Sequence, residues 1–418
     1  METPLRGWIA ILLLALAWGL GPAVPALLRG DLLGHPYTDL YPAVWGLHAF
    51  ATHQPGLPAW TESLCWPTGM GFYYSSPIHG WLATPLLPLL GLRNTWNVLI
   101  VGARIATVLL TYHWLRAEGA RPWGALAGAG LYGCAACFHG FAVEGIVEGT
   151  DAWTLPLWGW CVARRRPLAS IAAFFLVILS SWYLGAGGLV VALFWGGERR
   201  LAIGSALIGS ILALPLWFTF QGAFPAAAPL SEAVREAMGA VIRIPAPGWA
   251  PGLHPFAKTS YIGWLAVVLF GVGARHRPWL AAGAMTCWIL SLGRGPWYDL
   301  PGLAMVRFPY RFVAGSLFLA APIVARVIDR IGNTPRFSRF GAWAWLVAPA
   351  LVLEAWLAAP VEPVIPGASP LVPAAYAHVR PGALLEIPGP VAMPPGVINR
   401  SRPRARGTAA RGSLREQG

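Results

Sequence analysis

Three carboxylates stand close together between two long apolar stretches, at Glu144, Glu148 and Asp151. On a helix their i, i+4 and i+7 spacing would place them on one face, whereas the interspersed glycines favour a loop equally. Acids near the hydrocarbon edge are costly unless they are paired, protonated or metal-bound. The cluster therefore predicts a site for a divalent metal, Mg or Mn. A solvated outer loop that holds nothing is the alternative interpretation.

A second candidate lies earlier in the chain, where Asp39 sits in an aromatic-rich stretch that runs from His35 to Trp45. A carboxylate among aromatic residues at a membrane surface can act as a general base or as a ligand for a divalent metal. We therefore predict Asp39 as the catalytic residue, with His35 and His53 as further candidates. The alternative is an aspartate that only caps a turn or the start of a helix.

Arginines supply the third group, at Arg294, Arg307 and Arg311. A guanidinium recognises phosphate through paired donors, so these residues are candidates for binding a lipid-linked phosphate. The alternative is that they extend toward lipid head groups or pair with a nearby acid, Asp299.

Composition identifies the elements that must position these residues. Of 418 residues, 56% are hydrophobic and only 11% are charged, far fewer than the roughly 25% charged residues of a soluble domain. Apolar runs of about 20 residues match the hydrocarbon core of a bilayer, and in lipid such runs must be helices. The net charge of +13 sits in small clusters between these runs, which argues against nucleic acid as a partner. The sequence predicts an all-α polytopic membrane protein.

We expect about eleven transmembrane helices, several of them short enough to require tilting or burial within the protein. The arginine clusters of the short loops alternate with arginine-poor loops, so the positive-inside rule places the N-terminus in the cytoplasm and the C-terminus outside. Segment 76–90 is then a juxtamembrane helix in the first outer loop, 30–95. The predicted spans lie near residues 8–29, 97–115, 122–139, 152–163, 168–182, 185–197, 201–220, 256–274, 278–293, 312–327 and 340–359.

The chain divides into three parts by composition. Residues 1–360 form the transmembrane domain, and residues 361–398 are expected to begin an extracytoplasmic domain. Residues 399–418 are rich in arginine and of low complexity, which is typical of a disordered tail. A truncation or an altered reading frame is one interpretation of this change in composition.

The order of these pieces resembles the GT-C superfamily of membrane glycosyltransferases, in an uncharacterised bacterial branch. The resemblance rests on short motifs across residues 1–390. They are the acidic first outer loop; Trp66-Pro-Thr-Gly69, Ser75-Ser-Pro77 and Gly91-Leu-Arg-Asn94 after it; and the later Gly293-Arg294, Arg307-Phe-Pro-Tyr-Arg311-Phe and Glu386-Ile-Pro388. Asp39 lacks the adjacent second acid that many members carry.

The resemblance implies a hexosyl- or pentosyltransferase of the bacterial inner membrane. It would move a sugar from a polyprenyl-phosphate carrier to an extracytoplasmic glycan, lipid or protein. Asp39 would match the first-loop acid, Asp151 with Glu144 or Glu148 the metal-binding acids, and Arg307 and Arg311 the lipid-phosphate site. Two rival functions remain open at this point: a lipid or solute transporter or flippase, and a non-catalytic membrane scaffold.

Overall fold

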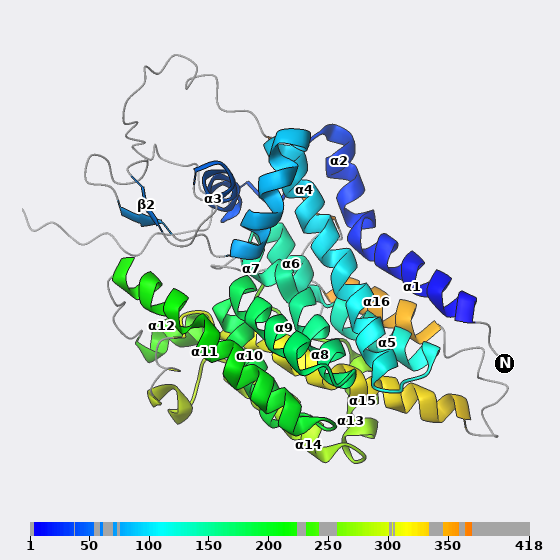
Figure 1. Cartoon of the computed structure of the whole chain (residues 1–418). Coiled ribbons are helices and arrows are strands. Elements are labelled where there is room, and N and C mark those ends of the chain that lie inside the picture. The colour runs from blue at the N-terminus through cyan, green and yellow to red at the C-terminus, as the bar shows by residue number, and fades with distance from the viewer. Residues whose placement is uncertain are drawn as a thin grey trace, which may run out of the picture. The chain divides into compact units, whose positions relative to one another are not determined.

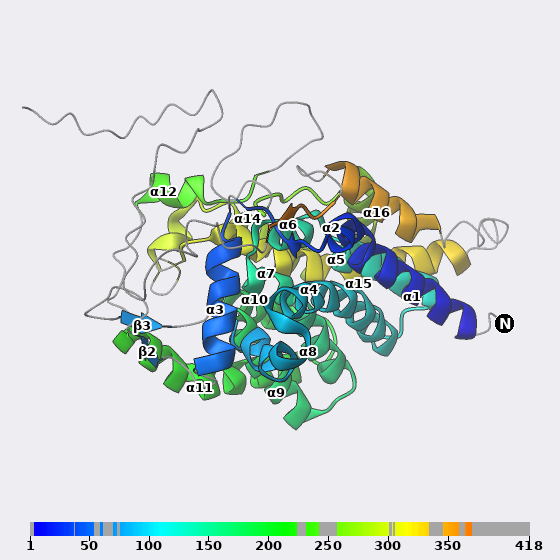
Figure 2. The same ribbon diagram turned by 90° about the horizontal axis from the view of Figure 1, so that it is seen from above.

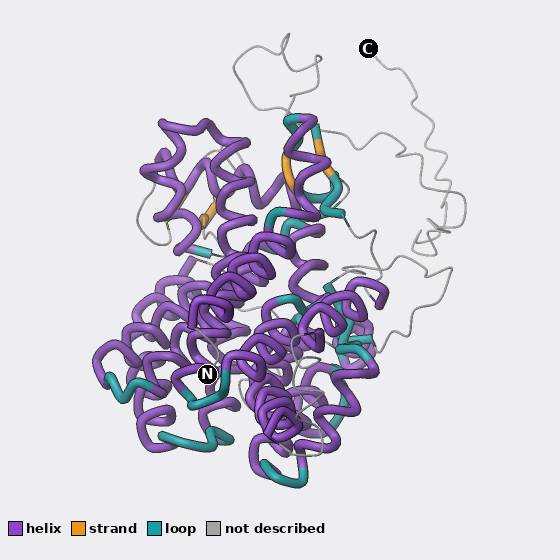
Figure 3. Tube along the Cα trace, turned by 90° about the vertical axis from the view of Figure 1, so that its right-hand side faces the viewer, coloured by secondary structure: helices purple, strands orange, loops and turns teal. Residues whose placement is uncertain are grey.

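The computed structural model describes residues 4–36, 38–53, 59–61, 70–72, 76–223, 231–241, 257–300, 303, 306–333, 346–358 and 364–369. Residues 1–371 form one compact unit. The predicted disordered tail and most of the predicted extracytoplasmic segment lie outside the described residues, as do the motifs at residues 66–69 and 386–388. Helices dominate the part of the chain that is described, as the sequence predicts (Figures 1 and 3).

The helices overlap the predicted apolar stretches, but some predictions differ from the structure. The predicted span 122–139 is divided at Cys134–Ala135, and the described part of the predicted span 256–274 is helical only from Trp264. The bounds of the helices are α1 Pro4–Gly19, α2 Val24–Arg29, α3 Leu40–His53, α4 Pro77–Ala117, α5 Pro122–Gly133, α6 Ala136–Glu144, α7 Val147–Thr150, α8 Thr154–Ala163, α9 Pro167–Ser180, α10 Trp182–Leu193, α11 Arg199–Ala223, α12 Glu232–Ala237, α13 Trp264–Ala274, α14 Pro278–Ser291, α15 Val313–Asn333 and α16 Val347–Ala358. Short 3-10 turns include η1 at Gly21–Ala23 and η5 at Pro309–Phe312.

Five helical segments of the described chain are long and apolar enough to cross a membrane. They are 7–29, 77–117, 122–144, 199–218 and 309–332. Large apolar side chains point outward from these helices: Leu13 is 62% exposed on α1 and Ile211 is 61% exposed on α11. A water-soluble protein rarely exposes contiguous apolar surface of this kind. The outward faces therefore fit a lipid environment and an integral membrane protein.

The first apolar stretch is broken in the middle. Gly21 and Pro22 form the 3-10 turn η1 between α1 and α2, because proline cannot donate the hydrogen bond that a continuous helix needs. The guanidinium of Arg104 on α4 donates to the carbonyl of Trp18 at 2.8 Å and lies over the Trp18 ring. A buried arginine thus satisfies a backbone carbonyl beside the break.

Helix α4 contains a second break, at Gly91, whose φ of 71° and ψ of 165° are not helical. Glycine alone adopts such a conformation without strain. The break separates residues 77–90 from the apolar helix that follows, and these residues contain Pro85 and Pro88. Segment 76–90 is therefore a distinct helix, whereas its predicted position along the membrane surface stays a prediction.

The interior centres on α15, which packs against α5, α14 and α13. Small residues let the backbones approach closely: a Cβ at Gly128 of α5 would lie 2.9 Å from the carbonyl oxygen of Ala321 on α15. Such contacts are typical of helix packing in membranes. Helix α3 packs beside the first part of α4 (Figure 2), which brings the predicted first loop to the end of the bundle where α4 begins.

Two short antiparallel strand pairs complete the described structure. Strand β2, Ala59–Thr61, pairs with β3, Met70–Phe72, inside the predicted first loop. Strand β1, Leu32–Leu33, pairs with β4, Gly367–Ala368. The second pair joins the segment after the first apolar stretch to the segment after the last one.

Candidate functional site

Asp151 is completely buried and lies against the first turn of α4. Its Oδ2 accepts a hydrogen bond from the Ser76 hydroxyl and lies 3.1 Å from His79 Nδ1, while Trp153 Nε1 donates to Oδ1 at 3.0 Å. Ser76 is also the N-cap of α4, where its hydroxyl accepts from the backbone N–H of His79. A carboxylate at this position is stabilised by the positive end of the helix dipole.

The arrangement around Asp151 differs from a nucleophilic triad. In a triad the imidazole bridges acid and hydroxyl with its two different nitrogens. Here His79 Nδ1 lies near both partners, 3.1 Å from Asp151 and 3.2 Å from the Ser76 hydroxyl. The cluster can anchor the start of α4 to the segment after α7, but it has no imidazole relay.

Glu148 forms an ion pair with Arg311, whose Nη1 lies 2.7 Å from Oε1. Both side chains are largely buried, with 16% and 7% of their surfaces exposed. The Arg311 guanidinium lies 4.5 Å from the ring centre of Tyr183 and 4.8 Å from that of Phe308. Aromatic faces attract a guanidinium, so this charged group is held in place by one acid and by the rings around it.

Glu144 is buried as well and accepts a hydrogen bond from the backbone N–H of Ala257 at 2.9 Å. The adjacent Lys258 donates from Nζ to the carbonyl of Ala237 at 2.7 Å. The side chain of Lys258 also lies within electrostatic range of Glu144. Glu144 thereby joins the end of α6 to the segment that leads into α13.

The three acids do not fit a shared metal site in this arrangement. Asp151 interacts with Ser76, His79 and Trp153, Glu148 with Arg311, and Glu144 with a backbone N–H. Within the described ranges, no three His, Cys, Asp or Glu side chains are grouped so that they could hold a metal ion. The expected Mg or Mn site stays a prediction.

The stretch around Asp39 packs directly against the segment that carries these acids. The backbone N–H of His35 donates to the carbonyl of Val143 at 2.7 Å. Asp39 is exposed and immediately precedes α3, and its carbonyl accepts from Ala43 at 3.0 Å, which is the position of a helix N-cap. The side chain of His53, at the end of α3, lies outside the described part. The structure thus brings His35 and Asp39 to the segment between Val143 and Glu148.

Gly145 packs closely against the first residue of α3, Leu40. Its φ is +71°, and a Cβ there would lie 2.6 Å from Leu40 Cα and 2.8 Å from Leu40 N. We expect Gly145→Ala to destabilise the protein by about 1–3 kcal/mol, because both the left-handed backbone and the contact resist a side chain. The measurement is the thermal unfolding midpoint in detergent.

Gly102 of α4 provides the matched control, since a Cβ at that position meets nothing within 4 Å. Gly102→Ala should be neutral or stabilise by up to about 1 kcal/mol. Equal unfolding midpoints for the two variants would contradict the close packing of residues 39–40 on Gly145.

The other two candidate arginines lie at the surface. Arg294 is exposed and forms an ion pair with Glu236 of α12. The alternative interpretation expected an ion pair with a nearby acid, and the acid is Glu236 and not Asp299. Arg307 is exposed and lies within electrostatic range of Tyr183, as do Arg311 and Glu148. Of the three arginines, Arg311 forms an ion pair with one of the predicted acids, Glu148.

Sequence reasoning missed four polar residues that the structure places in these clusters. Ser76 and His79 hold Asp151, Lys258 lies near Glu144, and Arg104 is buried beside Trp18. Two of them carry a signal that could have been used. Lys258 is the sole lysine of the sequence, and Arg104 is a charged residue inside a predicted span, which by itself marks a candidate functional position.

An apolar groove of about 300 Å³ opens between α13, α14 and α15. Its lining includes Ser260, Trp264, Phe270, Trp288, Val313 and Ser316. Along the chain the groove begins two residues after Lys258 and two residues after Arg311. Two buried basic residues are therefore close in sequence to the lining of the groove.

Comparison with known proteins gives no family for this chain. No family model matches the sequence, and no curated protein matches it significantly. What the chain does must therefore be argued from its own residues and their arrangement.

Proposed function

We propose that the protein is a GT-C-like glycosyltransferase that takes a sugar from a polyprenyl-phosphate carrier and transfers it to an extracytoplasmic acceptor. In this proposal it crosses the bacterial inner membrane about eleven times, with a cytoplasmic N-terminus and an extracytoplasmic C-terminus. The end of the bundle where α4 begins is the outer one. The pairing of β1 with β4 supports this topology, because it joins two segments that the parity of the spans puts on the same side.

One observation carries the proposal: two buried basic residues, Lys258 and Arg311, come just before residues that line an apolar groove. Arg311 and Lys258 each precede the groove by two residues. A polyprenyl phosphate combines a long apolar chain with a single anionic group. The groove offers surface for the isoprenoid chain, and arginine is suited to the phosphate because its planar donors match the phosphate oxygens.

The proposed reaction assigns roles by exposure and charge. Asp39 is exposed, so its carboxylate can accept the proton of an acceptor hydroxyl. The acceptor oxygen then bonds to the anomeric carbon of the sugar, and the bond from that carbon to the phosphate oxygen breaks. The electron pair leaves with the polyprenyl phosphate, whose added charge Arg311 and Arg307 stabilise. Fixed positive groups facing a leaving phosphate are the largest expected source of rate enhancement.

A transporter or flippase is the second candidate, and a specific observation favours it. Arg104 is buried within a membrane-length helix, beside the break between α1 and α2. Transporters commonly combine intramembrane charges with broken helices at their binding sites. If a fluorescent, sugar-bearing lipid phosphate moved across the membrane of a vesicle without transfer of its sugar, this candidate would be favoured. A non-catalytic scaffold is the weakest of the three candidate functions, because it does not explain why basic side chains are buried.

Filling the groove tests the proposal. We expect Ser316→Phe to weaken the binding of polyprenyl phosphate by about tenfold or more, because excluding two CH₂ groups costs about 0.8 kcal/mol each. Binding is measured by native mass spectrometry of the detergent-solubilised protein. Thr286→Phe on α14 is the matched control, since Thr286 is outside the groove lining. Unchanged binding in the Ser316 variant would remove the groove from the proposal.

A further inference from the structure

Two sets of arginine contacts lie at the end of the bundle where α4 finishes. Arg326 on α15 donates to the carbonyls of Glu118 and Gly119, at 2.6 and 3.2 Å. Arg165 of the α8–α9 turn pairs with Glu198, which precedes α11, at 2.7 Å. These contacts lie at the opposite end of α4 from the proposed transferase site.

A cavity of about 360 Å³ lies at this end between α15 and the α13–α14 turn. Three arginines line it, Arg277, Arg326 and Arg330, together with His276 and one acid, Asp329. The volume equals that of about twelve water molecules at about 30 Å³ each. The cavity is therefore large enough for a phosphate group and the atoms esterified to it.

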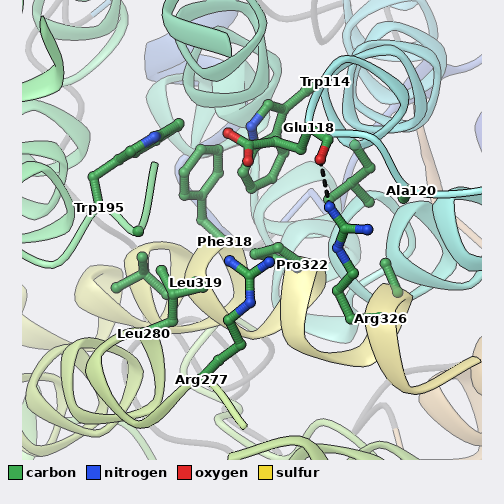
Figure 4. A pocket seen from close by; sticks show the side chains of 13 residues that line it. Trp114, Glu118, Ala120, Trp195, Arg277, Leu280, Phe318, Leu319, Pro322 and Arg326 are labelled. Atoms are coloured by element: carbon green, nitrogen blue, oxygen red, sulfur yellow. Dashed lines mark hydrogen bonds between the residues drawn. The ribbon is translucent and has the colours of Figure 1, made fainter. Parts of the chain in front are cut away.

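A narrower crevice, drawn in Figure 4, shares Arg277 and Arg326 with this cavity. Both guanidinium groups point toward Glu118 and the stacked rings of Trp114 and Phe318 (Figure 4). Burial raises the pKa of Glu118, and the charges of Arg277 and Arg326 oppose that shift. The arginines are thus turned inward, toward protein, and not only toward the surrounding medium.

The acid of the cavity has a structural task. Asp329 Oδ2 accepts the backbone N–H of Arg121 at 2.9 Å, directly before α5. A carboxylate at the start of a helix is stabilised by the helix dipole. Asp329 is the one acid beside three arginines in the cavity lining, and its carboxylate is held toward α5. Glu118, in the crevice, is a second acid near Arg277 and Arg326.

His276 adds a neutral donor. Its Nε2 accepts from Arg275 Nε at 3.2 Å, so the ring hydrogen belongs on Nδ1. Partial desolvation and the charges of Arg330 and Arg275 lower the pKa of His276, which keeps the ring neutral at pH 7. A neutral imidazole with Nδ1–H can donate one hydrogen bond to an anion.

We propose that this cavity binds a phosphate group, either in the head group of an anionic phospholipid or as a free phosphate. Planar guanidinium donors match phosphate oxygens in pairs, and basic pockets between membrane helices are suited to anionic head groups. The site is separate from the transferase site and uses none of its residues.

The test compares phosphatidylglycerol with phosphatidylcholine in native mass spectrometry of the full-length protein. In the double variant Arg277→Gln/Arg330→Gln we expect the affinity for phosphatidylglycerol to fall roughly 30-fold, the factor for two arginines at about 1 kcal/mol each. Arg326 is left intact because it holds the end of α4. The control Arg164→Gln/Arg166→Gln removes two charges from the α8–α9 turn and should change the affinity less than threefold.

Inorganic phosphate supplies the second arm of the experiment. Displacement of phosphatidylglycerol by millimolar phosphate in the wild type, lost in the double variant, would identify a free phosphate as the ligand. Binding of the lipid without such competition would identify the head group. The proposal is overturned if the double variant binds phosphatidylglycerol as well as the wild type, or if the control loses as much affinity. Neither result would bear on polyprenyl-phosphate binding at the other end.

Discussion

Replacing Arg311 with methionine is expected to lower the free energy of unfolding by about 3–5 kcal/mol, the usual cost of breaking a buried ion pair. The variant leaves the Glu148 carboxylate buried without its partner, because only 16% of that side chain is exposed. It also removes the guanidinium that lies over the rings of Tyr183 and Phe308. The measurement is the thermal unfolding midpoint in detergent.

Two further variants separate the loss of the pair from the loss of a large side chain. The double variant Glu148→Gln/Arg311→Met removes both charges and should recover a substantial part of the loss, which a double-mutant cycle quantifies. Arg307→Met changes an exposed arginine four residues earlier and should shift the midpoint little. If Arg311→Met were no more harmful than Arg307→Met, the buried pair would not be a main support of this end of the bundle.

Replacing Asp39 with asparagine is expected to reduce sugar transfer by about 10²–10⁴-fold, the range that a general base contributes. Asparagine keeps the size and the capping ability of the side chain, so the unfolding midpoint should remain near that of the wild type. Transfer is measured in proteoliposomes from a radiolabelled polyprenyl-phosphate sugar to an extracted envelope acceptor.

Asp31→Asn provides a matched control from the same loop. Asp31 pairs with Arg29 at 2.8 Å, and the proposed reaction gives it no task. It should retain transfer within a fewfold of the wild type. Full activity of the Asp39 variant would remove the general base from the proposed mechanism, and equal losses in both variants would indicate an effect on the loop.

The helices could be predicted from sequence because their signal is local. Long apolar runs indicate where α11 and α15 lie, with ends that differ from the prediction by up to six residues, since backbone groups in lipid must be paired within the segment. The break at Gly91 and the turn at Gly21–Ala23 were less accessible. These two breaks depend on where glycine and proline lie relative to tertiary contacts. The apolar pattern of the sequence continues through both breaks and therefore does not mark them.

The candidate site could be predicted only in part. The residue types can be read at each position, whereas the partners of these residues lie far away in the sequence. The cost of placing acids near lipid correctly implied that Glu144, Glu148 and Asp151 need partners. It did not indicate which partners, and Ser76 lies 75 residues from Asp151 while Ala257 lies 113 residues from Glu144. Such pairings follow from the packing of helices, which a single sequence leaves open.

We propose that a lipid-linked phosphate binds at the outer end of the bundle. The most direct test compares two lipids that differ only in the phosphate group. Purified protein is mixed with polyprenyl phosphate and with the corresponding polyprenol, and bound lipid is counted by native mass spectrometry. We expect selective retention of the phosphate form, and a loss of that selectivity in Arg307→Ala/Arg311→Ala, with the unfolding midpoint of the variant measured in parallel. Equal retention of both lipids by folded wild-type protein would contradict the proposal.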